Sequence, residues 1–206
     1  MSIVVEHDKR RYEILEKALD VFMDEGFEDV TFQKIADRCG ITRTTLYIYF
    51  KNKREIFNYS IKQLLQGLEE ELNRIRSEKS LSRREQLIQV MSAIIDTLEE
   101  NQRLLKVVLN YLSYLTKGDH DPDYRVRRRT MRLRHILNAI LIEGIRTNEF
   151  SPVNVKAANE ALYAFLEAVV FRLSILNRSG AEEIKHAMTM MVNQLAIAGP
   201  KRQEKS

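Results

Sequence analysis

The chain has 206 residues, of which 44% are hydrophobic and 30% are charged. These values are typical of a globular protein with one ordinary domain or two small ones, and they exclude a largely disordered chain. The single cysteine, Cys39, excludes an internal disulfide framework and favours a reducing cytoplasm. The longest stretch without a charged residue or histidine, 187–200, contains Asn and Gln, so we expect no membrane span.

The net charge of +4 is modest, but its distribution is uneven. Within 34–54 six Lys and Arg residues accompany one acid, Asp37, although 1–57 as a whole is not basic. Positive charge concentrated on one short segment is typical of a local contact with a polyanion.

Helical periodicity predicts an all-α protein with about nine helices, because no segment alternates as a half-buried strand does. In chain order the predicted helices are Arg11–Glu25, Phe32–Cys39, 43–50, 52–79, one from Ser82, Asn101–Leu115, one from Asp121, one from Ser151 and one from Ser179 to Gly199.

Helix ends are marked by residues with specific roles. Gly26 and Gly40 follow helices, where a left-handed residue is common, and Thr31 and Thr42 are placed to cap the next two. Ser82-x-x-Glu85 predicts a capping box. Three further starts are predicted, at Asp121-Pro122, Ser151-Pro152 and Ser179-x-x-Glu182, and Gly67 and Gly144 are attributed to close packing inside helices.

The segment 31–50 has the pattern of a helix-turn-helix. Ile35 and Ala36 share one helical face, Gly40 allows a tight turn, and Leu46 and Phe50 recur four residues apart. The second helix then presents its other face, which begins at Arg43, away from that buried seam. A helix of this size fits the major groove of DNA.

The sequence TFQKIADRCGITRTTLYIYFKNKREIF, 31–57, resembles the TetR family of bacterial transcriptional regulators. The shared elements are Thr-x-x-x-Ile-Ala, the Gly-Ile-Thr turn, Leu-Tyr-x-Tyr-Phe and Lys-x-Lys-x-x-Ile. The similarity is specific over about 8–57 and only architectural beyond it. Cys39 stands where alanine is usual in the family, and we expect it to pack as a small buried residue.

The resemblance implies a three-helix DNA-binding head, 1–51, and a six-helix effector-binding and dimerisation body, 52–206. It implies that Tyr47, Tyr49, Lys51, Lys53, Thr31 and Gln33 hold phosphates, which sets position and salt dependence. Arg43, Thr44 and Thr45, after the capping Thr42, are expected to face base edges. Lys9, Arg10 and Arg11 are weaker candidates for flanking phosphates. Two alternatives remain open: Tyr47 packs against the first helix, and Arg43 pairs with Asp37.

The last two helices are predicted to form a homodimer, which is also how the family dimerises. Residues 157–176 are almost continuously apolar, and the last helix repeats Ile184, Ala187/Met188, Met191, Leu195 and Ala198 at helical spacing.

The resemblance also implies a small-molecule effector pocket in the body. The candidate effector-binding residues are Tyr111, Tyr114, His135, Asn138, Tyr163 and Arg172. Arg172 interrupts an apolar face and is assigned either to the rim of the dimer or to an acidic ligand. The six arginines within Arg125–Arg134 are interpreted as a solvated helix face, with an anionic effector or a second acidic partner as alternatives.

The hypothesis from the sequence is therefore a cytoplasmic homodimeric repressor that binds a palindromic operator in double-stranded DNA and is released by a small apolar or amphipathic effector. The alternative is a DNA-binding factor of the same fold that responds to a protein partner or acts in chromosome or division control. We expect no enzymatic activity, metal or cofactor, because no phosphate loop, nucleophile motif or metal-ligand spacing is present.

Overall fold

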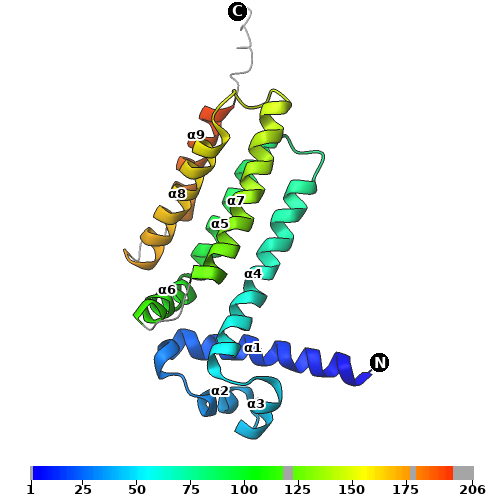
Figure 1. Ribbon diagram of the computed structural model, residues 1–206, viewed down its shortest axis with the longest axis vertical. Coiled ribbons are helices and arrows are strands. Elements are labelled where there is room, and N and C mark those ends of the chain that lie inside the picture. Colours follow the sequence, from blue (N-terminus) through cyan, green and yellow to red (C-terminus); the bar gives the residue numbers. More distant parts are fainter. Residues whose placement is uncertain (1, 118–122, 177–179, 197–206) are drawn as a thin grey trace, which may run out of the picture. The chain divides into compact units, whose positions relative to one another are not determined.

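The computed structural model describes residues 2–117, 123–176 and 180–196, and the side chains within them except those of 2–5, 114–117 and 123–130. These residues form nine α-helices and no named strand, which confirms the all-α prediction (Figure 1). The predicted helix starts at Asp121 and Ser179, and the predicted end at Gly199, lie outside the described residues. None of the described helices has an apolar stretch long enough to cross a membrane.

The chain divides into two packing units. Unit 1 comprises 1–69 and 101–122, and unit 2 comprises 70–100 and 123–206. Unit 1 contains α1 (Ser2–Asp29), α2 (Phe32–Cys39), α3 (Arg43–Tyr49) and α6 (Gln102–Lys117). Unit 2 contains α5 (Arg83–Glu100), α7 (Asp123–Arg146), α8 (Val155–Ser174) and α9 (Ala181–Leu195). The long helix α4 (Lys53–Ser77) contributes to both units.

The core of unit 1 is rich in aromatic rings. Phe22 and Phe27 of α1 contact Phe57 of α4 at centroid distances of 4.8 and 5.1 Å. Tyr111 of α6 packs on Phe27 and Phe57 at 4.3 and 4.9 Å. Tilted and edge-on rings at these distances are favourable beyond the area that they bury. Cys39 also lies in this core, and burial raises the pKa of its thiol, so it packs as a small neutral residue as expected.

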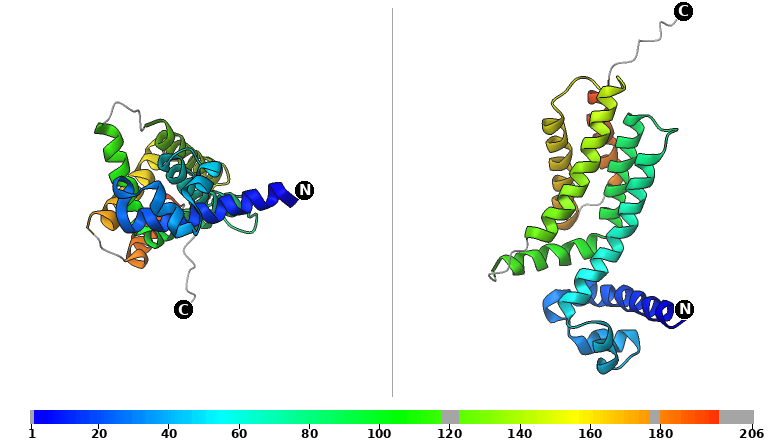
Figure 2. Two further views of the ribbon diagram at one scale, coloured as in Figure 1. Left: turned by 90° about the horizontal axis from the view of Figure 1, so that it is seen from below. Right: turned by 45° about the vertical axis from the view of Figure 1, so that its right-hand side comes forward.

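Unit 2 is built around α5, which contacts α7, α8 and α9 (Figures 1 and 2). The predicted capping box at its start is confirmed. The Ser82 hydroxyl accepts the Glu85 amide at 3.1 Å, and the Glu85 carboxylate accepts the Ser82 amide at 2.8 Å. Both free donors at the helix start are therefore satisfied.

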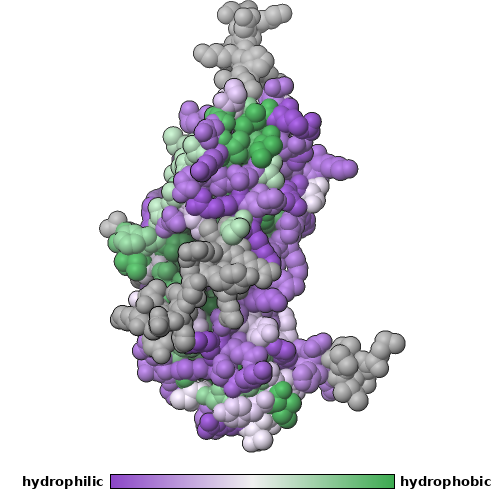
Figure 3. Space-filling view, in the orientation of Figure 1, coloured by the Kyte–Doolittle hydropathy of each residue, from purple (hydrophilic) through white to green (hydrophobic). Residues whose placement is uncertain are grey.

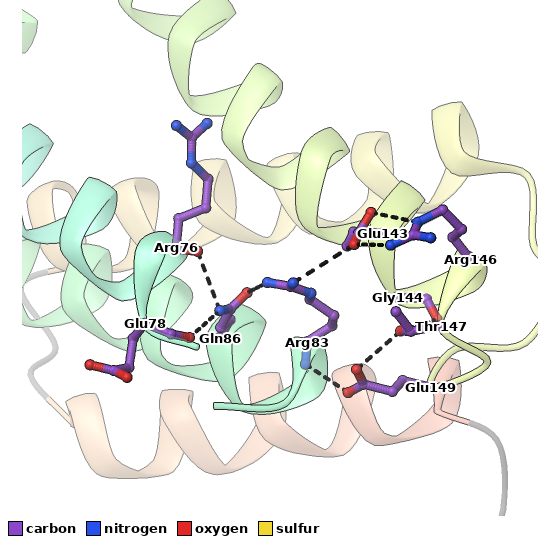
Figure 4. A network of polar contacts seen from close by, with 9 residues as sticks. All are labelled: Arg76, Glu78, Arg83, Gln86, Glu143, Gly144, Arg146, Thr147 and Glu149. Carbon is purple, nitrogen blue, oxygen red and sulfur yellow. Dashed lines mark hydrogen bonds and ion pairs between the residues drawn. The ribbon is translucent and has the colours of Figure 1, made fainter. Parts of the chain in front are cut away.

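A polar network joins the turn before α5 to the end of α7 (Figure 4). Buried Gln86 donates to the carbonyl oxygens of Arg76 and Glu78, and its own oxygen accepts from Arg83 at 2.7 Å. The Arg83 amide donates to Glu149 at 2.6 Å. A carbonyl in the last turn of α4 and one just after the helix thus gain a partner that the helix itself cannot supply.

The predicted start of α8 at Ser151-Pro152 is wrong. The helix begins at Val155, and Asn154 caps it by accepting the Ala157 amide at 3.1 Å. The Ser151 amide instead donates to the Leu195 carbonyl at 2.9 Å, beside an isolated bridge between Phe150 and Ala196. A backbone contact with a segment distant in sequence has replaced the local Ser-Pro start.

The two glycines inside helices differ. A Cβ on Gly144 would overlap the Phe150 ring, so close packing explains this glycine as predicted. A Cβ on Gly67 would meet nothing within 4 Å, so the prediction is wrong there. Gly26 interrupts α1 with φ 80° and ψ 163°, a positive φ as expected but outside the left-handed helical region.

Candidate nucleic-acid interface

The turn between α2 and α3 follows from local backbone chemistry. The Thr31 hydroxyl accepts the Lys34 amide at 3.2 Å and caps α2. Gly40 adopts the left-handed conformation, φ 67° and ψ 35°, and its amide returns to the last carbonyls of α2. Thr42 then caps α3 by accepting the Thr45 amide at 3.1 Å. The predicted caps and turn are confirmed.

One side of α3 is buried and the opposite side is free. Leu46 and the adjoining Phe50 are at most 1% exposed. Arg43, Thr44, Tyr47 and Ile48 are all exposed. Helical geometry places Arg43 beside Tyr47 and Thr44 beside Ile48, so the free side carries two parallel rows of side chains.

Arg43 is held in place by Tyr47. The guanidinium donates to the Tyr47 hydroxyl at 3.2 Å, and the Tyr47 ring packs on Phe32 of α2 with centroids 4.6 Å apart. Arg43 does not pair with Asp37 among the described residues. Asp37 instead accepts a hydrogen bond from Gln33 at 2.7 Å. Among the described residues the ring contact of Tyr47 is with α2 and not with the first helix. The guanidinium is thus braced while it remains exposed.

The other candidate side chains of this region are partly engaged. The Thr45 hydroxyl lies 2.8 Å from that of Thr42 and belongs to the helix cap. The Tyr49 ring stacks on His7 of α1 at 4.7 Å, in an open hollow of about 600 Å³ that is also lined by Lys9 and Arg10. Tyr49 therefore lies beside the cations at the start of α1.

Three of the six cations in 34–54 are engaged by carboxylates or backbone carbonyls of unit 1. Lys34 pairs with Glu25, and Arg38 pairs with Asp24 at 3.1 Å. The Lys53 ammonium donates to the carbonyl oxygens of 27, 28 and 30 at 2.9, 2.7 and 2.8 Å. Burial lowers the pKa of Lys53 from its ordinary value. Lys53 therefore fastens the loop after α1 to the start of α4.

The remaining three cations are Arg43, Lys51 and Arg54, which are all exposed. The Lys51 backbone amide donates to Glu55 at 2.6 Å, and its side chain has no ion-pair partner among the described residues. Of the candidates in α1, Lys9 is exposed, Arg10 pairs with Glu13 at 2.9 Å, and Arg11 lies over the rings of Phe50 and Tyr59.

The candidate effector residues are not gathered at one place. Tyr111 belongs to the filled aromatic core of unit 1, whereas His135, Asn138, Tyr163 and Arg172 belong to unit 2. His135 is exposed, and the side chain of Tyr114 lies outside the described residues, as do those of most of the Arg125–Arg134 cluster. Arg172 donates to Glu183 of α9 at 3.3 Å.

A hollow of about 300 Å³ does occur beside Asn138, between α7 and α8. Arg134, Ile142 and Lys156 also line it. Buried Asn159 donates to the Asn138 side chain at 2.6 Å and to the Arg134 carbonyl at 2.7 Å. Arg134 lies over the Tyr163 ring at 4.1 Å and pairs with Glu160. Of the candidates, Asn138 therefore lines the hollow, and Tyr163 contacts one of its lining residues.

Sequence reasoning missed three features of the interface. They are the donation from Gln33 to Asp37, the stack of His7 on Tyr49, and the cation–π contacts of Arg11. Only the first had a sequence signal, the four-residue spacing within one helix. The others depend on how α1 crosses α3 and α4.

A capped helix, a left-handed glycine turn and a second helix with an exposed polar side define a helix-turn-helix DNA-binding protein. The profile of the family described as "Bacterial regulatory proteins, tetR family" matches residues 14–59. The HTH-type transcriptional regulator YfiR of Bacillus subtilis is 31% identical over 158 residues, which are 74% of each chain. The chain belongs to the TetR family of bacterial transcriptional regulators.

Two solved structures show the same fold over almost the whole chain. A TetR transcription regulator from Haloarcula marismortui has a TM-score of 0.80 at 17% identity and covers 92% of this chain and 100% of its own. FadR from Bacillus subtilis in complex with stearoyl-CoA has a TM-score of 0.70 at 21% identity, covering 87% and 96%.

Proposed function

We propose that this protein is a homodimeric repressor that inserts α3 of each subunit into the major groove of a palindromic operator. The observation that carries the proposal is the exposed side of α3, where Tyr47 braces the Arg43 guanidinium and no residue of the head covers it. A fixed guanidinium suits guanine, which offers two acceptors, O6 and N7, in the major groove.

Within this proposal the candidate residues have different roles. Arg43 and Thr44 face base edges, whereas Tyr49, Lys51, Thr31 and Gln33 contact phosphates and set the register of the head on the duplex. Thr42 and Thr45 shape the start of α3 through their shared hydroxyl contact, and Lys53 organises the loop after α1. Tyr47 acts mainly by holding the Arg43 guanidinium in position.

The dimer is formed by one face of α8 together with part of α9. The exposed face of α8 carries small and apolar side chains at helical spacing, namely Ala157, Ala161, Ala164, Ala168 and Phe171, and the exposed Ile175 follows the helix. Small side chains let two helices approach closely, and Phe171 is 55% exposed in the single chain. On α9 we assign the exposed Ala187 and Met190 to the same interface. Ile184 and Met188 were also expected there, but they are buried in unit 2.

An effector acts through α4, which belongs partly to each unit. A ligand can shift the protein away from DNA only if it binds the non-binding arrangement more tightly, and couplings of about 1–3 kcal/mol are typical. The related fold that binds stearoyl-CoA supports an amphipathic effector. The Arg134 and Lys156 cations and the apolar Ile142 beside the α7–α8 hollow suit a ligand with an anionic head and an apolar tail.

The filled aromatic core around Tyr111 favours the second candidate, a regulator of the same fold that responds to a protein partner. Thermal unfolding with a series of acyl-CoAs of increasing chain length separates the two. A concentration-dependent rise in melting temperature that grows with chain length supports the small-molecule effector.

The test of DNA recognition starts from a sequence selected by the wild-type protein from random duplex DNA. Arg43→Ala should weaken binding to that sequence by about 1–3 kcal/mol per half-site. Arg146→Ala is the control, because it removes an equally charged and exposed side chain from unit 2. Equal binding by both variants would refute the proposed role of α3.

A further inference from the structure

Ile48 is the most exposed large hydrophobic side chain among the described residues, with 70% of its surface accessible. It lies on α3, whose packing against the head is provided by Leu46 and by the adjoining Phe50. Neither burial nor helix propensity explains an isoleucine here, because a β-branched residue is a weak helix former. Figure 3 shows a small hydrophobic area among polar side chains at the lower end of the view, where Figure 1 places α3.

Ile48 belongs to the second of the two rows on α3, which runs next to the row formed by Arg43 and Tyr47. Residues four apart on a helix are neighbours, so Ile48 adjoins Thr44, just as the contacting pair Arg43 and Tyr47 shows for the parallel row. One row therefore offers hydrogen-bond donors. The other offers methyl groups, because Ile48 has no polar atom in its side chain and Thr44 adds its own methyl.

The major groove contains one apolar group that distinguishes bases, the C5-methyl of thymine. Uracil and cytosine lack it. A side chain that cannot donate or accept a hydrogen bond gains from a base edge only by covering such a methyl and removing it from water. A phosphate or a guanine edge would leave Ile48 without a favourable contact.

We propose that Ile48 reads a thymine in each half-site through contact with its C5-methyl group. The inference rests on the proposed function and deepens it, since it predicts a methyl-bearing pyrimidine beside the base that Arg43 contacts. Ile48 is then a determinant of sequence preference, separate from the residues that set affinity through phosphates.

The experiment uses the full-length protein and the duplex selected in vitro. Each thymine is replaced by deoxyuridine, symmetrically in both half-sites and one pair of positions at a time. Dissociation constants are measured by fluorescence anisotropy at one fixed salt concentration. The substitution removes only a methyl group and leaves every hydrogen-bonding atom of the base in place.

At one pair of positions, deoxyuridine should weaken wild-type binding by roughly 4-fold per methyl group, or roughly 15-fold for both half-sites. Ile48→Ala should bind the thymine duplex more weakly and lose the preference at that pair alone, whereas Ile48→Val should keep most of it. The high exposure of Ile48 means that both variants should melt like the wild type.

The proposal is overturned if Ile48→Ala keeps the full preference for thymine at every pair, or if wild-type binding is indifferent to all the replacements. Either result leaves the proposed function intact, because sequence-specific binding that depends on Arg43 would still be observed. Failure of the proposed function has a different signature, which is the recovery of no preferred sequence from random DNA.

Discussion

Lys51 precedes α4 and Lys53, two residues later, begins it, yet their ammonium groups have different surroundings. Lys53 donates to three backbone carbonyls, whereas the side chain of Lys51 is exposed. Both were expected to hold phosphates, and the sequence could not separate them. The carbonyl partners of Lys53 come from 23 to 26 residues earlier in the chain, so no local spacing reveals them.

Replacement of each lysine by methionine distinguishes the two roles, because methionine keeps a long apolar stem and removes the charge. Lys53→Met should lower the free energy of unfolding by about 1.5–3 kcal/mol, since three carbonyls lose a charged donor. Lys51→Met should leave the free energy of unfolding within about 0.5 kcal/mol of the wild type. It should reduce the slope of the logarithm of the DNA-binding constant against the logarithm of the salt concentration by about 1 per subunit. Denaturant unfolding measures the change in stability, and salt titration of DNA binding measures the change in slope. Identical unfolding midpoints for Lys53→Met and Lys51→Met would contradict the role assigned to Lys53.

Other residue-level predictions depended on local chemistry and were accurate. Thr31, Thr42 and Gly40 were assigned from the preferences of helix ends, which act within four residues. The exposed side of α3 followed from the spacing of Leu46 and Phe50. What the sequence could not predict is which candidate side chains are already engaged by distant partners, as the stack of His7 on Tyr49 illustrates.

At the scale of the elements, Asp24 joins three helices of unit 1. Its carboxylate accepts from Arg38 of α2 at 3.1 Å and from Arg103 of α6 at 2.8 Å. The hydrogen bonds from Arg38 and then Arg103 lower the pKa of Asp24 from its ordinary value near 3.8. A lowered carboxylate pKa contributes stability above the unfolded pKa, and that stability is lost as the pH falls through the folded pKa.

Asp24→Asn should therefore be less stable than the wild type near neutral pH, and the difference should shrink as the pH falls below about 3.8. Melting temperatures recorded from neutral to acidic pH provide the measurement. Asp20→Asn, on the same helix and exposed, is the control and should show no such convergence. A difference for Asp24→Asn that stays constant with pH would contradict the assignment of the ion pairs.

Helix existence was predictable from periodicity, whereas some boundaries and glycines were not. The Ser151-Pro152 start failed because a contact between 150–151 and 195–196 extends the preceding loop. Gly67 and Gly144 look alike in sequence, and only Gly144 is opposite an aromatic ring. The deciding partner of Ser151 is far away in the chain, whereas that of Gly144 is Phe150, just after the end of the same helix.

At the scale of the whole molecule, the proposed dimer depends on the exposed face of α8. Figure 3 shows hydrophobic surface where the C-terminal end of α8 lies. Phe171, near that end of the helix, and Ile175, which follows it, are both exposed. The division into a head, 1–51, and a body, 52–206, remains a prediction about function. The packing units divide the chain elsewhere, because α6 packs with α1.

Phe171→Glu should convert the dimer into a monomer at micromolar concentration, because two carboxylates would be buried in the apolar interface. Sedimentation equilibrium measures the mass. Met131→Glu places the same charge at another exposed apolar position, on α7, and should remain dimeric. Dissociation of both variants, or of neither, would contradict the assignment of the interface to α8.

The central claim is that two α3 helices, fixed by one dimer axis, read two half-sites of the same operator. Hydroxyl-radical footprinting of the wild-type dimer on its selected duplex tests this most directly. We expect two protected regions related by two-fold symmetry, with centres about 10 base pairs apart or slightly more, and loss of both in Arg43→Ala. A single unsymmetrical footprint, or one that survives in Arg43→Ala, would contradict it.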